Sequence, residues 1–468
     1  MRSVGLWVHG TSLASMSLSV AEAIRVEVLP TMKSEHGQFF TPARLAEQVV
    51  KGLRLPEQGT LRVLDIGAGA GALTAALADR ACDIPGLSLD ITCVELDGDV
   101  VPYLHQTVDA LNARVIHGDV LELAVTGELG EDYDVVVMNP PYGKLAAASA
   151  ERRAMAHLGV ETPNFYAAFM AVGYLHLREG GQMAAIVPRS WANGPYFKRF
   201  RRHMLDHISI DRLQSFASRS SLFSDAKVLQ ENVILTGTRG APQGDIELVF
   251  DDGEPQSVSV SRVVVPTDPE RFVRIPTGAE RELPGVPLSA VGLTVSTGKV
   301  VDFRSRDHLV EPGKNTFPMV YQGNVHGGMV EWPREVGKPQ GFVCSPEEER
   351  KYLVPAGVYV IVKRFSAKEE KRRVVAGVHV SETPVAYDNK TNVIACPDQD
   401  TAVGLALWLN STAVDTYFRS FSGHTQVNAT DLRGMPYPSL DVLRSLGAGR
   451  PVRMPSQEAI DSAVEELL

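Results

Sequence analysis

The sequence predicts an α/β fold, with a doubly wound, mostly parallel sheet of seven strands followed by a second domain rich in β-structure. From about Glu35 to Arg239, short apolar runs alternate with helical patterns, which is typical of βαβ units. After Gly240, Pro, Gly and charged residues become frequent and the helical spacing fades. A chain of 468 residues is also too long for one compact domain.

Seven apolar runs predict the strands of this sheet. Five of them alternate with helical patterns and therefore predict parallel strands, over residues 61–67, 89–96, 114–120, 133–140 and 181–188. Two later runs, RLQSFAS from Arg212 and VLQENVILTG from Val228, predict an antiparallel hairpin at one edge. Helices are predicted over residues 72–81 and 164–178, the second ending before Gly180-Gly181.

The composition divides the chain further. The predicted segments are an N-terminal extension (1–33), the sheet domain (34–240), a linker (241–287), the β-rich domain (288–440) and a C-terminal tail (441–468). The four cysteines form no CxxC pair, so neither a disulfide framework nor a zinc site is expected. The expected location is a reducing cytoplasm. No run of about 18 apolar residues predicts a membrane span. The net charge of −10 argues only weakly against a nucleic-acid partner, because binding depends on the local surface.

The tetrapeptide Asn139-Pro140-Pro141-Tyr142 follows the fourth predicted strand and carries the most chemistry. The Asn139 side-chain oxygen and the Pro140 carbonyl can accept both hydrogens of a planar amino group. The prolines remove backbone donors, and the ring of Tyr142 offers a face for a flat heterocycle. This arrangement favours alkylation of an exocyclic or amide nitrogen, although a proline-rich turn after a strand remains an alternative.

The residues at the ends of the first three strands indicate the cofactor. Gly67, Gly69 and Gly71 follow the first strand and open a helix, which favours close approach of a ligand to the backbone. Asp65 precedes these glycines, where a carboxylate suits an ammonium group, and Glu95 ends the second strand, where it can accept two ribose hydroxyls. Asp119 lies at the end of the third predicted strand and can accept from an adenine amino group. A ligand with an amino acid at one end and a nucleoside at the other is S-adenosylmethionine. A helix cap or turn remains the alternative for each acid alone.

This ordered set resembles the adenine-N6 DNA methyltransferases of type II restriction-modification systems, gamma class. The segment Gly37 to Pro42 (GQFFTP) precedes the Gly-rich loop as the cofactor segment of that class does, and a long C-terminal region follows. The chain is similar to the stand-alone modification methylases that accompany enzymes such as PstI and BsuBI. The resemblance implies a methyltransferase sheet that uses S-adenosylmethionine, a C-terminal target-recognition domain, and a bacterial or archaeal cytoplasm.

The resemblance also implies roles for individual residues. The target adenine would be flipped out of double-stranded DNA, with N6 held by Asn139 and the Pro140 carbonyl and the base stacked on Tyr142. Phe223, before the last hairpin, would close the other face of the base, with a core position as its alternative. Phe40 would pack against the cofactor and Thr41 would lie near its carboxylate; Asn139 would border the cofactor as well. The reaction needs no metal.

The C-terminal domain would read the target sequence. Candidates for phosphate contacts are the basic residues Lys363, Arg364, Lys371, Arg372 and Arg373, with a solvated face as the alternative. Gln426 and Asn428 carry amides that can pair with adenine edges, and turn capping by Asn428 and Thr430 is an equally good interpretation.

Three rival functions stay open at this point. One is NPPY chemistry on another nitrogen, such as an RNA guanine or a protein glutamine. A second is a DNA-binding subunit built on an inactive methylase fold, and a third is a modification subunit that needs a separate specificity protein. Cytosine-N4 enzymes more often carry a Ser-Pro-Pro variant, so adenine is the expected base. The family match also implies functional pairing with a restriction endonuclease.

Overall fold

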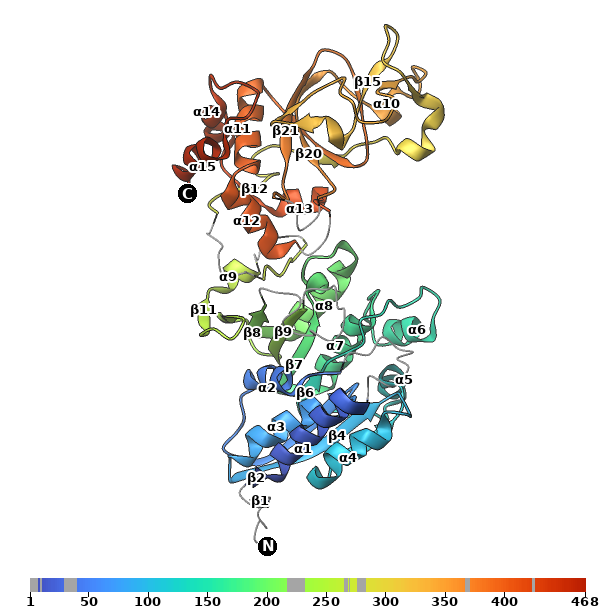
Figure 1. Cartoon of the computed structure of the whole chain (residues 1–468), viewed down its shortest axis with the longest axis vertical. Helices are drawn as coiled ribbons and strands as arrows, with labels where there is room; N and C mark the ends of the chain where they lie inside the picture. Colours follow the sequence, from blue (N-terminus) through green and yellow to red (C-terminus); the bar gives the residue numbers. More distant parts are fainter. Residues whose placement is uncertain are drawn as a thin grey trace. The chain divides into compact units, whose positions relative to one another are not determined.

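The structure, a computed structural model, describes residues 7–8, 11–28, 40–216, 232–264, 268, 270–275, 283–366, 371–422 and 426–468. The chain divides into two compact units, Met1–Thr277 and Gly278–Leu468 (Figure 1). Within the described ranges, no helix is both long and apolar enough to cross a membrane.

The first unit is built on one sheet of nine strands in the order β11-β10-β8-β9-β7-β6-β3-β4-β5. Its strands are β3 (Gln58–Ile66), β4 (Gly86–Glu95), β5 (Arg114–His117), β6 (Tyr133–Met138), β7 (Leu177–Pro188), β8 (Ile208–Ser215), β9 (Asn232–Arg239), β10 (Ile246–Phe250) and β11 (Gln256–Val258). Strands β3 to β7 run parallel, and β9 pairs antiparallel with both β7 and β8. The predicted mostly parallel α/β fold is confirmed. The predicted antiparallel pair, β8 and β9, is present but lies inside the sheet rather than at its edge.

Two strands were not expected. β10 and β11 lie within residues 241–287, which the sequence analysis assigned to a linker, and the sheet therefore has nine strands rather than seven. β10 pairs parallel with β8 and buries Ile246 and Leu248. A short edge strand flanked by charged residues gives only a weak alternation, which explains why the sequence pattern missed it.

Helices cover both faces of this sheet. They are α1 (Leu13–Ala23), α2 (Ala43–Lys51), α3 (Ala72–Cys82), α4 (Val101–Val108), α5 (Val120–Thr126), α6 (Ala150–His157), α7 (Phe165–His176) and α8 (Lys198–His207), with the short α9 (Val260–Val263) after β11. Along β6, Val135 and Val137 enter one core with α2 and α3, whereas Val136 and Met138 enter the other with α7. This alternation follows from the two-residue period of a strand and buries both faces of the sheet.

The N-terminal segment is part of this unit. α1 contacts α3 and α4, beside which it lies in Figure 1, and it buries Leu18 and Ala21 in their core. The expectation that residues 1–33 form an extension outside the sheet domain is therefore wrong for residues 13–23. Leu18, Ala21 and Ile24 are spaced as one face of a helix, and that face packs against the domain.

The second unit combines sheets and helices. A six-stranded sheet contains β13 (Val295–Thr297), β23 (Thr391–Cys396), β20 (Gly357–Lys363), β21 (Ala376–Ser381), β17 (Met329–Val330) and β16 (Val325–His326). A five-stranded sheet contains β14 (Leu309–Val310), β18 (Gly341–Phe342), β15 (Phe317–Val320), β22 (Val385–Tyr387) and β19 (Leu353–Val354). The helices α10 (Glu349–Tyr352), α11 (Gln399–Leu409), α12 (Thr412–Phe421), α13 (Ala429–Gly434), α14 (Leu440–Gly447) and α15 (Gln457–Glu465) complete it, with β12 (Val286–Pro287) pairing with β24 (Pro436–Tyr437).

The C-terminal residues belong to this unit rather than to a tail. α14 packs against α11 and buries Leu443, and α15 buries Ile460 and Val464. Gly404 on α11 and Gly447 on α14 lie at the crossing, where a Cβ atom on either would overlap the backbone of the other helix. The expectation of a separate tail over 441–468 is therefore wrong, because α14 and α15 bury apolar side chains against α11 and α12.

Candidate active site

Four of the predicted site residues lie at one edge of the first sheet. β6, β3, β4 and β5 are neighbours in that order and run parallel, so their C-terminal ends meet at the same edge. Asp65 lies near the end of β3 and Glu95 ends β4, whereas Asp119 and Asn139 follow β5 and β6. In open α/β sheets this edge forms the ligand crevice.

The glycine loop between β3 and α3 has a backbone that needs glycine. Gly67, Gly69 and Gly71 have φ angles of 73°, 54° and 82°, in the left-handed region. The ring of Phe40 lies so close to Gly69 that a Cβ atom there would be 3.2 Å from it. The backbone N–H of Gly69 donates to Oε2 of Glu95 at 2.8 Å, which ties the loop to β4. The predicted neighbours Phe40, Gly69 and Glu95 are thus brought together.

Asp65 lies beneath this loop and is fully buried. The Thr74 hydroxyl donates to its Oδ2 at 2.7 Å, whereas its Oδ1 has no hydrogen-bond partner among the described residues. Burial raises the pKa of the Asp65 carboxyl to about 7. A buried acceptor with an unused oxygen fits a cationic group, as expected for the end of the cofactor that carries an ammonium.

The other two acids already accept hydrogen bonds from the backbone. Glu95 is buried, its Oε1 accepts from the N–H of Asp97 at 2.8 Å, and burial raises the pKa of its carboxyl. Asp119 is the N-cap of α5 and accepts from the N–H of Leu121 at 2.7 Å. The capping alternative for Asp119 is therefore present in the structure. The ribose contact of Glu95 and the adenine contact of Asp119 stay predictions.

Asn139 connects the NPPY loop after β6 with the segment around Phe40. Its Nδ2 donates to Oγ1 of Thr41 at 2.9 Å, although the two residues are 98 positions apart in sequence. The Tyr142 hydroxyl lies 3.5 Å from Oδ1 of Asn139, at the limit of a hydrogen bond. This bond to Thr41 turns the carbonyl end of the amide toward Tyr142. The sequence placed Thr41 only with the cofactor and gave no signal for its contact with Asn139.

Tyr142 is nearly buried beside this amide. Burial raises the pKa of its phenol above the ordinary range, so the ring is uncharged near neutral pH. Its ring stands edge-on to that of Tyr166, with centroids 6.5 Å apart and an interplanar angle of 85°. No sequence signal indicated Tyr166, which lies in the first turn of α7 inside an apolar run and has no motif of its own. Phe223 lies outside the described residues.

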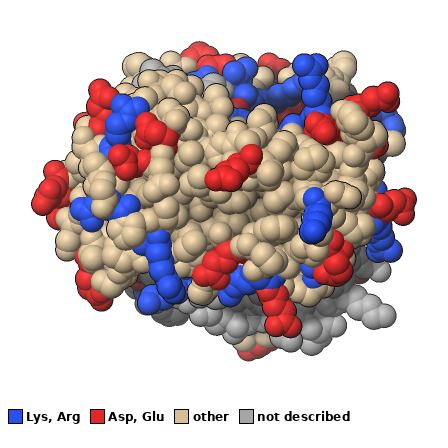
Figure 2. Space-filling model, turned by 90° about the horizontal axis from the view of Figure 1, so that it is seen from above, with Lys and Arg blue, Asp and Glu red and all other residues tan. Residues whose placement is uncertain are grey.

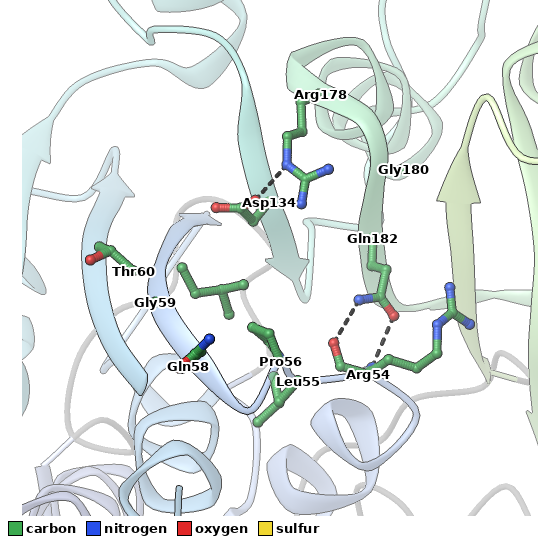
Figure 3. Close-up of a pocket in the computed structure, with 11 residues that line it drawn as sticks. Arg54, Leu55, Pro56, Gln58, Gly59, Thr60, Asp134, Arg178, Gly180 and Gln182 are labelled. Atoms are coloured by element: carbon green, nitrogen blue, oxygen red, sulfur yellow. Dashed lines mark hydrogen bonds and ion pairs between the residues drawn. The ribbon is translucent and has the colours of Figure 1, made fainter. Parts of the chain in front are cut away.

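A separate pocket opens at the other edge of the same sheet. It is lined by the first residues of β3, including Gln58 and Thr60, and by Asp134 and Gln182 (Figure 3). Arg178 pairs with Asp134, and the Gln182 amide is held by the backbone of Arg54. This pocket therefore lies at the N-terminal ends of the strands, opposite the glycine loop and Asn139, and is not part of the candidate site.

The basic residues predicted to contact phosphate have different environments. Lys371 is exposed, Lys363 is half-buried at the end of β20, and Arg364 donates to the carbonyl of Asn389 at 3.1 Å. Arg372 donates to the carbonyl of Ser411 and to the Thr412 hydroxyl at 3.1 and 3.0 Å. On the face drawn in Figure 2, side chains of both charges are scattered around a largely uncharged area. Phosphate contacts by these residues stay predictions.

Arg373 does not have the exposed position that the sequence predicted for it. Its side chain is only 1% exposed, its Nε donates to the Ser366 hydroxyl at 3.1 Å, and its guanidinium lies 5.4 Å from the ring centre of Phe418. A phosphate contact by Arg373 is therefore wrong, because the group lies inside the unit. Sequence alone cannot separate it from Lys371, since its burial depends on packing against Phe418 of α12, a separate part of the sequence.

We expect Lys371 and Arg373 to respond differently to substitution. Lys371→Glu should weaken binding to duplex DNA and reduce the slope of log affinity against log salt by about one or more, with little change in stability. Arg373→Ala should lower the free energy of unfolding by about 2–4 kcal/mol, because it empties a buried site. Salt-dependent binding and urea unfolding of both proteins measure this. Unchanged DNA binding by Lys371→Glu would contradict a phosphate contact by Lys371 and would favour a solvated side chain.

Of the two candidate base-reading amides, one has a structural role. Asn428 is the N-cap of α13 in a capping box, in which its N–H donates to the Asp431 carboxylate at 2.8 Å. The capping alternative is confirmed for Asn428. Gln426 lies in an isolated antiparallel bridge with Phe365, whose ring is 39% exposed. Recognition of a base by Gln426 stays a prediction.

Comparisons with known proteins agree with this geometry. Residues 106–223 match the family model of the Eco57I restriction-modification methylases, and residues 31–147 match that of the ribosomal RNA adenine dimethylases. The chain is 38% identical to the type II methyltransferase M.BsuBI of Bacillus subtilis, over 96% of this chain and 98% of that protein. It is 36% identical to the type II methyltransferase M.PstI of Providencia stuartii, over 92% of each chain.

One solved structure is similar along most of the chain. The type IIL restriction-modification enzyme MmeI, determined in complex with DNA, superposes with a TM-score of 0.51 and 11% identity. The match covers 97% of this chain and 73% of that enzyme, and it supports the fold alone. Among the residues that the structure describes, no three His, Cys, Asp or Glu side chains are grouped to hold a metal ion.

Proposed function

The chain belongs to the type II methyltransferases of restriction-modification systems, and from this premise we propose that it methylates N6 of an adenine flipped out of double-stranded DNA. The observation that carries the proposal is the position of Asn139. Its amide follows β6 at the ligand edge of the sheet and is oriented by Thr41, with Tyr142 beside its oxygen. This is an acceptor for a planar amino group next to an aromatic face.

S-adenosylmethionine supplies the methyl group when it is bound, as an electrophilic carbon on a positively charged sulfur. The residues present fit it. The unpartnered oxygen of Asp65 suits its ammonium, the left-handed glycines allow the backbone of the loop to approach it closely, and Phe40 lies against Gly69. Glu95 and Asp119 lie at the ends of the next two strands, where they can accept hydrogen bonds from the ribose and the adenine of the cofactor.

The residues of the chain hold the target nitrogen in place and accept its hydrogens. Asn139 Oδ1 and the Pro140 carbonyl accept the two N6 hydrogens, which directs the nitrogen lone pair toward the methyl carbon. With N6 held in this way, it would bond to the methyl carbon that the bound cofactor supplies, and the carbon–sulfur bond would break. The nitrogen then loses one proton to solvent, so no protein base is required. Tyr142 stacks on the adenine and excludes water from one face.

The proposal also specifies adenine as the target base and DNA as the substrate. Residues 31–147, which contain the glycine loop and the NPPY tetrapeptide, match a family whose name specifies adenine methylation of ribosomal RNA. The matches to type II methyltransferases along nearly the whole chain favour DNA over RNA as the substrate. We further propose that the methyl group protects DNA against a restriction endonuclease that recognises the same sequence.

Base-resolved sequencing of genomic DNA from a methylation-free host that expresses this chain tests the proposal. We expect N6-methyladenine at one short sequence motif, and none when the expressed protein carries Asn139→Ala. Methylcytosine at a motif would contradict the choice of base. Unmodified DNA in the presence of folded protein would contradict self-sufficient DNA methylation, and transfer of labelled methyl groups to RNA or protein would then identify the substrate.

A further inference from the structure

Tyr142 packs against a second buried tyrosine that the proposed chemistry does not use. Tyr166 is 1% exposed and is the second residue of α7. Its ring meets that of Tyr142 edge-to-face at 6.5 Å, and it lies 5.6 Å from the ring of Phe197 at an angle of 32°. Tyr142, Tyr166 and Phe197 form a continuous aromatic wall that joins the loop after β6 to the loop after β7.

The hydroxyl of Tyr166 is itself held. It lies 2.8 Å from the hydroxyl of Ser190, which belongs to the short helix η4 (Arg189–Ala192) directly after β7. The buried guanidinium of Arg201 donates to the carbonyls of Trp191 and Gly194, at 3.2 and 2.7 Å. Ser190 is therefore next to a backbone that is fixed from inside the protein.

The backbone beyond Tyr142 is fixed as well. Phe165 N–H donates to the carbonyl of Gly143 at 3.0 Å, and Leu145 N–H donates to that of Pro163 at 2.8 Å. An antiparallel bridge between Lys144 and Asn164 lies between these bonds. With its backbone held, the remaining freedom of Tyr142 is rotation of its side chain, and the edge contact with Tyr166 limits that rotation.

We propose that Tyr166, held by Ser190, is a positioning residue that sets the plane of the Tyr142 ring and thereby the plane of the stacked target adenine. This inference rests on the proposed function. A base that stacks on a tilted ring carries N6 away from Asn139 and from the line of attack, and small displacements of a reacting atom lower the rate steeply. Tyr166 touches neither the base nor the cofactor in this arrangement.

The test uses Tyr166→Phe, Ser190→Ala and the double variant in the full-length protein. Each single substitution removes the same hydrogen bond, so we expect each to lower kcat about 10-fold and the double variant to lose little more. The affinity for S-adenosylmethionine should stay unchanged. A duplex with 2-aminopurine at the target position should fluoresce more brightly with these variants, because a loosened stack quenches the base less.

Tyr174→Phe is the matched control. Tyr174 lies on the same helix, is fully buried, and loses an equivalent hydrogen bond, since its hydroxyl lies 2.7 Å from Nδ1 of His203. Its ring packs against His203 and His207, so kcat and the 2-aminopurine signal should remain those of the wild-type protein. Urea unfolding of all variants separates a loss of stability from a loss of positioning.

The outcomes separate this inference from the proposed function. If the wild-type protein methylates adenine and Tyr166→Phe and Ser190→Ala keep its kcat and fluorescence, the positioning role is overturned while the function stands. Equal losses in Tyr174→Phe would also overturn it, because the effect would then come from helix packing. A wild-type protein that methylates no DNA would overturn both.

Discussion

Replacing Asn139 with alanine is expected to lower kcat roughly 10²–10³-fold, while the affinity for S-adenosylmethionine stays close to that of the wild-type protein. The substitution removes the acceptor for the target amino group. In the folded protein it removes the bond to the Thr41 hydroxyl, about 1 kcal/mol, and the long contact with the Tyr142 hydroxyl. The effect is therefore chemical rather than structural.

Single-turnover methylation of a cognate duplex and calorimetric titration of the cofactor measure the two quantities. Asn112→Gly is a suitable control, because Asn112 is an exposed residue with a φ angle of 55° that glycine adopts readily. A parallel loss of cofactor affinity in Asn139→Ala would show that Asn139 serves mainly the cofactor and that the acceptor for N6 lies elsewhere.

Replacing Asp65 with asparagine is expected to change how stability depends on pH. Burial raises the folded-state pKa of Asp65 to about 7, above the value of about 3.9 for an unfolded chain. An acid whose pKa is higher in the folded state contributes stability that is fully present below the pKa of the unfolded chain. That stability is lost as the pH rises through the folded-state pKa. The cost of ionising Asp65 is therefore complete only above about pH 7, where it is on the order of 4 kcal/mol.

Urea unfolding of the protein without cofactor, at pH 5 and pH 8, tests this. Asp65→Asn should be more stable than the wild-type protein at pH 8, and that advantage should shrink at pH 5. It should also bind S-adenosylmethionine more weakly, because the carboxylate that faces the ammonium is gone. Asp83→Asn, at an exposed carboxylate that follows α3, provides the control. A stability difference that is the same at both pH values would contradict the assignment.

The sequence predicted the parts of this protein that depend on local pattern. Continuous apolar runs located β3 to β9, and the glycines at 67, 69 and 71 occupy a loop whose left-handed backbone requires them. Strand ends carry the chemistry in such sheets, so Asp65, Glu95 and Asn139 could be placed at one edge without knowing any distance.

What the sequence could not predict depends on contacts between distant residues. The bond between Asn139 and Thr41 spans 98 positions, and nothing near either residue indicates it. Arg373 and Lys371 are alike in a basic run, yet α12 covers one and leaves the other in solvent. α1, β10 and α14 were missed because the apolar face of each becomes meaningful only against the surface that it covers.

Two glycines from different helices meet where α11 and α14 cross. Because neither Gly404 nor Gly447 leaves room for a side chain, a change at one position cannot be accommodated by an adjustment at the other alone. A side chain at either glycine would push α11 and α14 apart. The exposed residues of the last helices therefore tolerate substitution, whereas the two positions at the crossing do not.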